Sequence, residues 1–385
     1  MKTYRIGVIG LGQRIAHVLS AMKEVGWSLE VAAHVDPAPV GAPILAAAGI
    51  DPGIACADPA ELFAHGPYDL VMIGSPNHLH FEHINLALDA GFPIFAEKPI
   101  VRTQSETLAL AHRLAAAEGP PIHIGLVMRS MSIVRETIAR VDSGELGQLI
   151  SIDATEHLPP EHGGYLARNW RRKQAYGGSY LLDKVCHDFD IFGRLARARP
   201  AKVASFGGRE IFTAARAGAY RYSDGQPAYA LRDAGWGGAN DAFQSDMDVT
   251  DHQNALVQYE NGVRLSFHAN SHVALPERRW YVAGTDGTLI ADLVRNKLMV
   301  RRTMDRGKPE RIDYGGRTED SHNGADQAMA RDLLATMEGR QPFPVTPFES
   351  MEAGLTVMAI DEAMESGDML DCRPMWARYD AARGA

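Results

Sequence analysis

The sequence RIGVIGLGQRI, residues 5–15, decides the fold of the first part of this 385-residue chain. An apolar run typical of a buried strand leads into a glycine turn, and a helical pattern follows. Gly10 permits the tight turn, and Gly12 lets the backbone approach a pyrophosphate at the N-terminus of the helix. The third glycine of a G-x-G-x-x-G motif is missing, because Ile15 stands at its position. A plain strand-to-helix turn therefore stays open as an alternative.

Strand-like and helical patterns alternate from this turn through the first third of the chain. The predicted strands are residues 5–9, 29–35, 69–73, 93–96 and 122–127, and the predicted helices are residues 15–25, 81–90 and 105–118. Such alternation is typical of βαβ units in a doubly wound parallel sheet. The predicted fold class is therefore α/β, with a Rossmann-type dinucleotide-binding domain over residues 1–125.

The pattern changes after residue 125, where hairpin turn signals such as Glu260-Asn261-Gly262 separate the strands. The predicted strands are residues 149–155, 201–206, 254–259, 263–269, 279–282 and 288–293, and the predicted helices are residues 132–141, 324–337, 348–366 and one that begins at Tyr180. This pattern predicts an α+β domain over residues 126–385, with a large, mostly antiparallel open sheet. Residues 207–238 are expected to form a long irregular loop.

The composition excludes several classes of protein. With 39 basic and 48 acidic residues, the chain has a net charge of −9, which disfavours nucleic acid as a partner. No apolar segment is long enough to span a membrane. The three cysteines lack C-x-x-C spacing, as expected in a reducing compartment. We therefore expect a soluble cytoplasmic protein.

An acidic residue follows the second predicted strand. Asp36 is suited to accept hydrogen bonds from the ribose hydroxyls of NAD, and its charge would repel the 2′-phosphate of NADP. Residues 37–50 contain no Arg or Lys to reverse this preference. Arg14 is the counter-argument, since a guanidinium in the glycine loop could reach a 2′-phosphate. The sequence thus predicts NAD, with NADP as the alternative and a turn-capping aspartate as the structural explanation.

Three spaced segments resemble the Gfo/Idh/MocA oxidoreductase family. They are DLVMIGSPNHLH (69–80), AGFPIFAEKP (90–99) and GGSYLLDKVCHDFD (177–190), and the resemblance extends over nearly the whole chain. It implies an NAD(P)-dependent oxidoreductase whose second domain binds the substrate. The cofactor-binding residues predicted in total are Gly10, Gly12, Gln13, Arg14, Asp36, Ser75, Pro76, Asn77, His80, Glu97 and Lys98.

Lys98 lies at the C-terminal end of a predicted strand, where open α/β sheets bind their ligands. A partly desolvated lysine can take up and release a proton near neutral pH. From the residues alone, a surface lysine paired with Glu97 is the competing interpretation. The family resemblance implies instead that Lys98 is catalytic and that the Lys98–Pro99 peptide bond is cis.

The helix that begins at Tyr180 carries a polar stripe. At about 100° per residue, Asp183, His187 and Asp190 fall within an arc of about 60°. Such a stripe suits general acid–base chemistry, although a solvated helix face is the alternative. The resemblance implies that Asp183 and His187 are catalytic residues beside the substrate, with His187 as the candidate base.

Lys184 departs from the family, which often has a small residue at this position. It either pairs with Asp188 one turn later or joins a group of cations in the preceding loop, at Arg168, Arg171, Arg172 and Lys173. Such a group would suit an anionic sugar, such as a uronate or a sulfosugar. Loop solubility and cofactor contacts are the other interpretation. The substrate-binding residues predicted in total are Lys98, Arg129, Arg171, Arg172, Asp183, Lys184, His187 and His322.

No metal site is predicted from the histidines of the first domain. His78, His80 and His83 share no helical face, and no carboxylate pair or cysteine completes a tetrahedral set with them. The resemblance implies that Asn77 and His78 line the nicotinamide side and that His80 helps to start a helix.

The predicted activity is hydride transfer between NAD and a sugar, cyclitol or related polyol. His187, assisted by Lys98 and oriented by Asp183, takes the hydroxyl proton. The alternative is an NAD-dependent glycoside hydrolase, which oxidises a glycoside transiently and eliminates its aglycone. A third possibility, a non-catalytic nucleotide sensor, would not need these three residues together. The resemblance also implies a homodimer or homotetramer.

Overall fold

The computed structural model consists of two compact units. The first comprises Met1–Met131, Gly324–Gly354 and Tyr379–Ala385, and the second comprises Ser132–Asn323 and Leu355–Arg378. The structure describes residues 2–116, 119–220, 225, 229, 235–315 and 323–384. No helix within these ranges is long and apolar enough to cross a membrane.

The division differs from the single boundary expected at residue 125. Helix α10 (Ala325–Met337) packs against α1 (Gln13–Glu24) and so belongs to the first unit. Beside these helices, the buried indole of Trp27 donates a hydrogen bond of 3.0 Å to the carbonyl oxygen of Ala330. The partners lie far apart in the sequence, so no local pattern could have predicted this contact.

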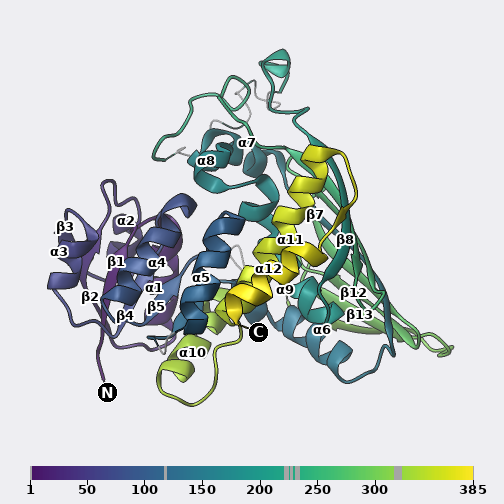
Figure 1. Cartoon of the computed structure of the whole chain (residues 1–385), viewed down its shortest axis with the longest axis horizontal. Coiled ribbons are helices and arrows are strands. Elements are labelled where there is room, and N and C mark those ends of the chain that lie inside the picture. Colours follow the sequence, from purple (N-terminus) through teal and green to yellow (C-terminus); the bar gives the residue numbers. More distant parts are fainter. Residues whose placement is uncertain are drawn as a thin grey trace. The chain divides into compact units, whose positions relative to one another are not determined.

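The first unit contains a parallel sheet of six strands (Figure 1). In spatial order they are β3 (Ile54–Cys56), β2 (Leu29–Val35), β1 (Tyr4–Ile9), β4 (Leu70–Ile73), β5 (Ile94–Ala96) and β6 (Ile122–Ile124). This is the strand order of a Rossmann-type sheet, so the predicted fold class is confirmed. The further helices of the unit are α2 (Ala42–Ala47), α3 (Pro59–Ala64), α4 (His80–Asp89), α5 (Gln104–Ala116) and the 3₁₀ turns η1 (Asn77–Leu79) and η2 (Val127–Ser130).

Burial explains which of these strands the sequence predicts. All four residues of β4 are buried, as expected for a central strand covered on both faces. Strand β3 was not predicted, because it has three residues and the first two are exposed. An edge strand of that kind shows neither an apolar run nor alternation.

The second unit contains a nine-stranded sheet (Figure 1). In spatial order its strands are β14 (Glu310–Asp313), β13 (Lys297–Arg302), β12 (Gly287–Asp292), β11 (Glu277–Gly284), β7 (Leu149–His157), β10 (Arg264–Asn270), β9 (His252–Tyr259), β8 (Pro200–Gly208) and β15 (Leu370–Asp371). Only β7 and β10 pair in parallel within this sheet, and its other neighbours are antiparallel. The expected large, mostly antiparallel sheet is therefore confirmed.

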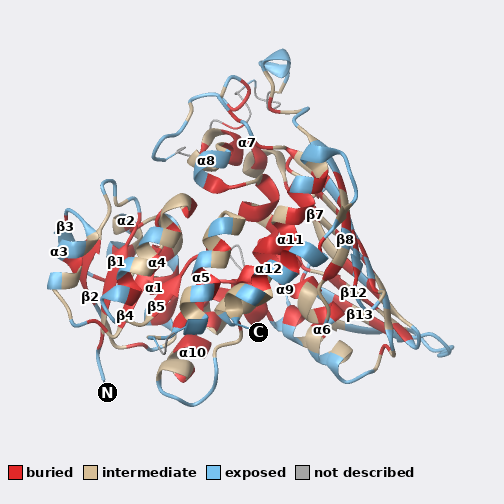
Figure 2. Cartoon of the chain, viewed as in Figure 1, coloured by how far each residue is buried: buried red, intermediate tan, exposed pale blue. Residues whose placement is uncertain are grey.

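One face of this sheet is covered by helices α6 (Ser132–Asp142) and α9 (Tyr180–Ala196), and alternate residues of β9 and β12 are buried on it. Buried residues accordingly run along most of α9 (Figure 2). The ring centroids of Phe192 and Trp280 lie 5.6 Å apart, which packs α9 onto β11. The remaining helices are α7 (Pro160–Arg168), α8 (Gln174–Gly177), α11 (Pro347–Ser366), α12 (Arg373–Arg383) and the 3₁₀ turns η3 (Trp170–Arg172) and η4 (Ala214–Arg216).

The segment between β8 and β9 has little regular structure where it is described. It contains η4 and otherwise turns and bends. Part of the loop expected over residues 207–238 lies outside the described residues.

Candidate functional site

The glycine turn after β1 is a tight loop with room for a ligand. Gly10 has a φ of +85°, and a Cβ atom there would lie 2.2 Å from the Ser75 backbone nitrogen. A Cβ at Gly12 would meet nothing closer than the Gly74 carbonyl oxygen, at 3.9 Å. Gly12 caps α1, and no side chain occupies the free N–H groups of that helix end. These features fit the pyrophosphate of a dinucleotide.

The missing third glycine is compensated from another strand. Ile15 occupies the third-glycine position on α1, and a Cβ at Gly74, directly after β4, would lie 2.0 Å from the Ile15 Cγ1 atom. Gly74 therefore provides the space for close helix–strand packing that the third glycine normally provides. The substitution of Ile15 changes which element carries the small residue and leaves the turn intact.

We expect the two glycines to respond differently to alanine. Gly10→Ala should lower the free energy of unfolding by about 2–3 kcal/mol, because both the positive φ and the contact with Ser75 strain the backbone. Gly12→Ala should leave the melting temperature of the ligand-free protein unchanged and weaken dinucleotide binding at least about 10-fold. Thermal melts and calorimetric titrations of both variants measure the two effects. Equal destabilisation by both substitutions would contradict this assignment.

Asp36 caps the turn after β2, as the structural alternative expected, and Arg14 is paired with acids of the same unit. Asp36 directly follows β2, and its Oδ1 accepts a hydrogen bond of 2.7 Å from the Ala38 amide. The Arg14 guanidinium contacts Glu97 Oε1 at 3.0 Å and Asp326 Oδ1 at 2.7 Å. Burial acts to lower the pKa of Arg14, but the two carboxylates outweigh it and raise this pKa above its ordinary value. Arg14 is thus held by two acids of its own unit, which removes the argument that it is available for a 2′-phosphate.

The segment Glu97-Lys98-Pro99 follows β5 and is fixed by its neighbours. Glu97 is 6% exposed, and a Cβ at Gly125 would lie 2.9 Å from its Oε1, so a side chain there would collide with the carboxylate. The Lys98–Pro99 peptide bond is cis, as the family resemblance implied. Lys98 itself is half-buried.

His80 joins the loops that leave β4 and β5. Its ring is 1% exposed, with Nδ1 lying 2.7 Å from the Pro99 carbonyl oxygen and Nε2 lying 2.9 Å from the Ser75 carbonyl oxygen. Burial lowers the pKa of this imidazole, while the two carbonyl groups act in the opposite direction. Both nitrogens are engaged by the protein backbone. The ring thus connects the segment after β4 with Pro99, the residue after Lys98, and its contact with the cofactor stays a prediction.

Three other predicted residues of the first unit, Ser75, Asn77 and Arg129, are buried. Ser75 and Asn77 are buried after β4, and the Ser75 hydroxyl lies 2.9 Å from His83 Nδ1. Arg129 is 7% exposed on η2, with its NH2 group 3.4 Å from Glu349 Oε1. His322 lies outside the described residues.

The polar face of α9 carries the acid and the histidine that the sequence singled out. Asp183 and His187 are buried, 5% and 8% exposed. Arg171 Nε donates to Asp183 Oδ1 at 3.2 Å, and its NH1 donates to Asn169 Oδ1 at 3.0 Å. The Arg171 guanidinium also lies over the Trp170 ring, 4.1 Å from its centroid. A solvated helix face is excluded, and the Asp183 side chain is held in place by an oriented guanidinium.

The other cations of this region are paired within the second unit. Arg172 Nε donates to Asp246 Oδ1 at 2.6 Å, and its NH1 donates to three backbone carbonyl groups. Lys173 contacts Asp248 Oδ2 at 2.8 Å. Arg172 therefore fastens the loop before β9, and the prediction that it binds substrate finds no support in this geometry.

Lys184 does not pair with Asp188. Its Nζ lies 3.6 Å from Glu156 Oε1 on β7, whereas the fully buried Asp188 accepts hydrogen bonds from Arg278 and from Trp280 Nε1. The i+4 spacing is correct, but the partners on β7 and β11 are better placed because they share the buried side of α9.

The sequence did not single out two residues of this region, Tyr180 and Asp361, as members of the site. Tyr180 lines a small hollow together with Asp183 and Arg171, and its buried hydroxyl has no hydrogen-bond partner among the described residues. Asp361 on α11 bonds to Ser179, the N-cap of α9. Tyr180 lies on the same helical face as Asp183 and could have been found from its spacing. No spacing in the sequence pointed to Asp361.

Two family models match the chain. One describes the oxidoreductase family with an NAD-binding Rossmann fold and matches residues 4–124, and the other describes the GFO/IDH/MocA C-terminal domain and matches residues 134–290. The first match lies within the first unit and the second within the second unit.

Curated relatives include inositol 2-dehydrogenases. The one from Corynebacterium glutamicum is 28% identical over 204 residues, which are 52% of this chain and 57% of that protein. The one from Mycolicibacterium gilvum is 31% identical over 195 residues, 50% of this chain and 52% of that protein. The chain thus spans little more than half the length of these relatives.

Solved structures with the same fold cover nearly the whole chain. Levoglucosan dehydrogenase in complex with NADH and levoglucosan has a TM-score of 0.76 at 20% identity, covering 96% of this chain and 99% of that one. Scyllo-inositol dehydrogenase from Lactobacillus casei, with NAD(H) and scyllo-inositol bound, has a TM-score of 0.73 at 20% identity, covering 97% and 100%. At this identity the likeness concerns the fold.

Proposed function

The chain belongs to the Gfo/Idh/MocA family of oxidoreductases, and from this premise we propose that it is an NAD-dependent dehydrogenase of a sugar, cyclitol or related polyol. The observation that carries the proposal is the pair of buried, oriented polar residues on α9, Asp183 and His187, in a chain whose other unit has a dinucleotide turn and Lys98. A non-catalytic sensor has no use for a buried acid–histidine pair of this kind.

The cofactor would be held by the first unit. The free N–H groups at the start of α1 suit the pyrophosphate, and Asp36 suits the adenosine ribose, since only one of its carboxylate oxygens is used by the Ala38 amide. When bound, NAD supplies the acceptor for the hydride that leaves the oxidised carbon. The ion pairs of Arg14 with Glu97 and Asp326 support NAD over NADP, because they use the guanidinium that a 2′-phosphate would need.

The chain's own residues would handle the proton. We assign His187 as the base for the substrate hydroxyl, with Lys98 assisting it and Asp183 orienting it, as in the family pattern. Arg171 holds the Asp183 side chain at 3.2 Å, which suits an orienting residue and leaves the imidazole as the group that exchanges a proton.

We propose an uncharged substrate. The anionic alternative rested on the cations of residues 168–173 and on Lys184. Arg171, Arg172, Lys173 and Lys184 each have an acidic partner in the second unit. A uronate or sulfosugar would have to displace these pairs, whereas a neutral polyol needs only hydrogen-bonding groups.

A substrate screen with NAD tests this function. Dehydrogenation of inositols, levoglucosan or other sugars should accumulate NADH in proportion to product, measured by its absorbance, and more slowly with NADP. Aryl glycosides in the same screen address the hydrolase alternative, since release of aglycone with catalytic NAD and no net NADH would replace the dehydrogenase proposal. Absence of both signals across neutral and anionic substrates would overturn it.

The position of Lys98 should depend on His80. His80→Leu removes both contacts with carbonyl groups, so we expect kcat to fall about 10-fold while NAD affinity stays within about 2-fold. His80→Gln, whose amide keeps N–H donors, should recover part of kcat. His123→Leu is the matched control, because His123 is a buried histidine of the same sheet whose pKa burial lowers to about 4. Equal losses of kcat in the His80 and His123 variants would contradict a positioning role.

We also propose association through the uncovered face of the nine-stranded sheet. Phe206, Leu256 and Tyr281 lie on that face and are 72%, 59% and 39% exposed. Apolar side chains in such a patch favour contact with a second copy. Sedimentation of Leu256→Glu against the wild-type chain tests this, with a smaller assembly expected for the variant.

A further inference from the structure

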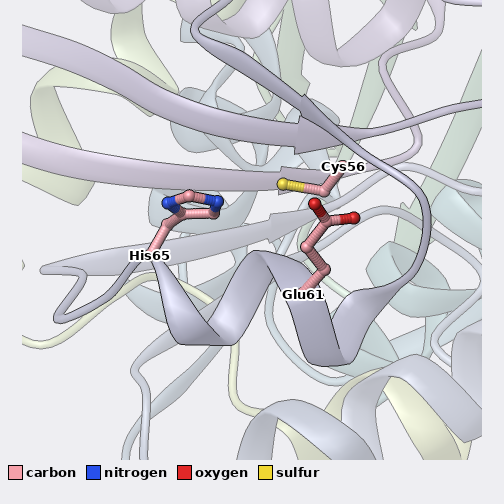
Figure 3. A group of neighbouring side chains, drawn as sticks. All are labelled: Cys56, Glu61 and His65. Atoms are coloured by element: carbon pink, nitrogen blue, oxygen red, sulfur yellow. The ribbon is translucent and has the colours of Figure 1, made fainter.

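Three metal-ligating side chains of different chemistry meet at the edge of the first sheet (Figure 3). Cys56 ends the edge strand β3, Glu61 lies in α3, and His65 is the C-cap of that helix. One ligand atom from each residue, the thiol sulfur, a carboxylate oxygen and a ring nitrogen, lies within 4.8 Å of the other two. None of these residues belongs to the site described above.

The local fold explains why the three side chains converge. Glu61 and His65 are four residues apart, so they lie on one face of α3 and its final turn. Figure 3 shows both pointing toward Cys56 at the strand end. The Glu61 Oε2 atom accepts a hydrogen bond of 2.7 Å from the Ala57 amide. The carboxylate is thus oriented by a backbone group, as acidic metal ligands usually are.

Each of the three residues keeps one ligand atom available. Glu61 uses only one oxygen for the Ala57 amide. Among the described residues, the Cys56 sulfur makes one long contact, of 3.8 Å, with the Ile54 carbonyl oxygen. The His65 ring has no hydrogen-bond partner within the described part of the chain. Ordinary packing does not account for a thiol, a carboxylate and an imidazole directed at one another with these positions open.

The electrostatics of the cluster favour a cation. The carboxylates of Glu61 and Asp58 both act on the buried Cys56 thiol. A divalent cation would stabilise the thiolate and neutralise the adjacent Glu61 carboxylate. Thiolate, imidazole and carboxylate together match the preference of zinc more closely than that of magnesium or calcium, which take oxygen ligands.

We propose that Cys56, Glu61 and His65 bind one divalent transition-metal ion with the chemistry of zinc. Water completes its tetrahedral coordination, since Glu61 is exposed and His65 is half-buried. Binding forms a metal–sulfur bond and releases the thiol proton to solvent, with no change of oxidation state. The ion would fasten the three-residue strand β3 to α3. Cys56 pairs with Val35, the residue before Asp36, so this bond lies beside the end of the ribose-binding strand.

Cobalt(II) titration of the whole chain, after chelator treatment, tests the proposal. We expect a thiolate-to-cobalt charge-transfer band that saturates at one ion per chain and disappears when zinc is added. Cys56→Ser should abolish the band and weaken zinc binding at least about 100-fold, and His65→Gln should weaken it at least about 10-fold.

Cys372→Ser is the matched control. Cys372 is also buried, and burial and the neighbouring acids Asp371 and Glu362 raise the pKa of its thiol to about 12, but no histidine joins it in a cluster of potential ligands within the described residues. This variant should bind cobalt as the wild-type chain does. A band that is absent from the wild-type chain, survives Cys56→Ser or is lost with Cys372→Ser overturns the proposal.

A thermal measurement separates binding from folding. Zinc should raise the melting temperature of the wild-type chain and leave that of His65→Gln unchanged, since this substitution removes a ligand at the half-buried helix end. If both chains respond equally to zinc, the ion binds elsewhere and the proposed site is wrong.

Discussion

Lys98→Ala is expected to lower kcat about 10²–10⁴-fold, the range that one positioned acid–base group contributes. The half-buried Lys98 follows β5, in a segment fixed on one side by Glu97 and on the other by the contact of Pro99 with His80. Alanine removes the amine and leaves this frame in place. Affinity for NAD, measured calorimetrically, should change far less than kcat, which stopped-flow NADH absorbance reports.

Lys98→Arg separates charge from proton transfer. Arginine keeps the positive charge but stays protonated at all working pH values, so it should bind substrate and fail to restore kcat. Lys23→Ala is the surface control, since the exposed Lys23 on α1 donates a hydrogen bond to the Gly49 carbonyl oxygen. If Lys98→Ala kept the wild-type kcat, the assigned mechanism would be wrong. If Lys98→Arg restored kcat, Lys98 would act through its charge and not through proton transfer.

The fold was predictable wherever periodicity was strong. Strand β4 is a continuous apolar run, β1 and β2 are mostly apolar and buried, and β9 and β10 alternate between a buried and an exposed face. Four strands were not predicted: the edge strands β3, β14 and β15, which are short and carry exposed residues, and β13, which is exposed at both ends. Edge strands have one neighbour, so their side chains are under weaker selection for burial.

The sequence identified residues of the candidate site, but it did not identify the side chains that pair with them. A helical spacing of three and four residues identified Asp183 and His187, and both are buried on α9. The acidic partners of the cations in the preceding loop were not predicted, because they, such as Asp246 for Arg172, lie more than one element away. Charge alone cannot distinguish a ligand-binding arginine from one that fastens a loop. The role of Gly74 could not be predicted for the same reason, because it depends on packing against Ile15, which lies on another element.

Asp361 has a buried carboxyl group that bonds to the N-cap residue of α9, the helix that carries Asp183 and His187. Its Oδ1 accepts a hydrogen bond of 3.1 Å from Gln253, and it bonds to Ser179, whose hydroxyl accepts from the Leu182 amide at the start of α9. Burial raises the pKa of Asp361 to about 7, although the hydrogen bonds from Ser179 and Gln253 act in the opposite direction. The native chain therefore retains at this position a proton that the unfolded chain releases near pH 4.

The sign of the resulting pH dependence follows from proton linkage. Between about pH 4 and pH 7 the native state binds more protons at Asp361 than the unfolded state does, so this carboxyl makes the free energy of unfolding fall as pH rises. The full difference is about 4 kcal/mol, reached above the native pKa. Asp361→Asn stays neutral at every pH and keeps a partner for Gln253. The variant should therefore match the wild-type chain near pH 4 and exceed its stability by up to about 4 kcal/mol at pH 8.

Urea unfolding from pH 5 to pH 8.5 measures this difference directly, because subtracting the two curves cancels the groups that both chains share. Glu260→Gln, at an exposed hairpin tip, should give a flat difference curve. A difference for Asp361→Asn that is also flat, or that favours the wild-type chain at high pH, would mean that Asp361 is ionised in the native state. Its hydrogen bonds to Ser179 and Gln253 would then outweigh its burial, and Asp361 would hold the start of α9 as an anion at every working pH.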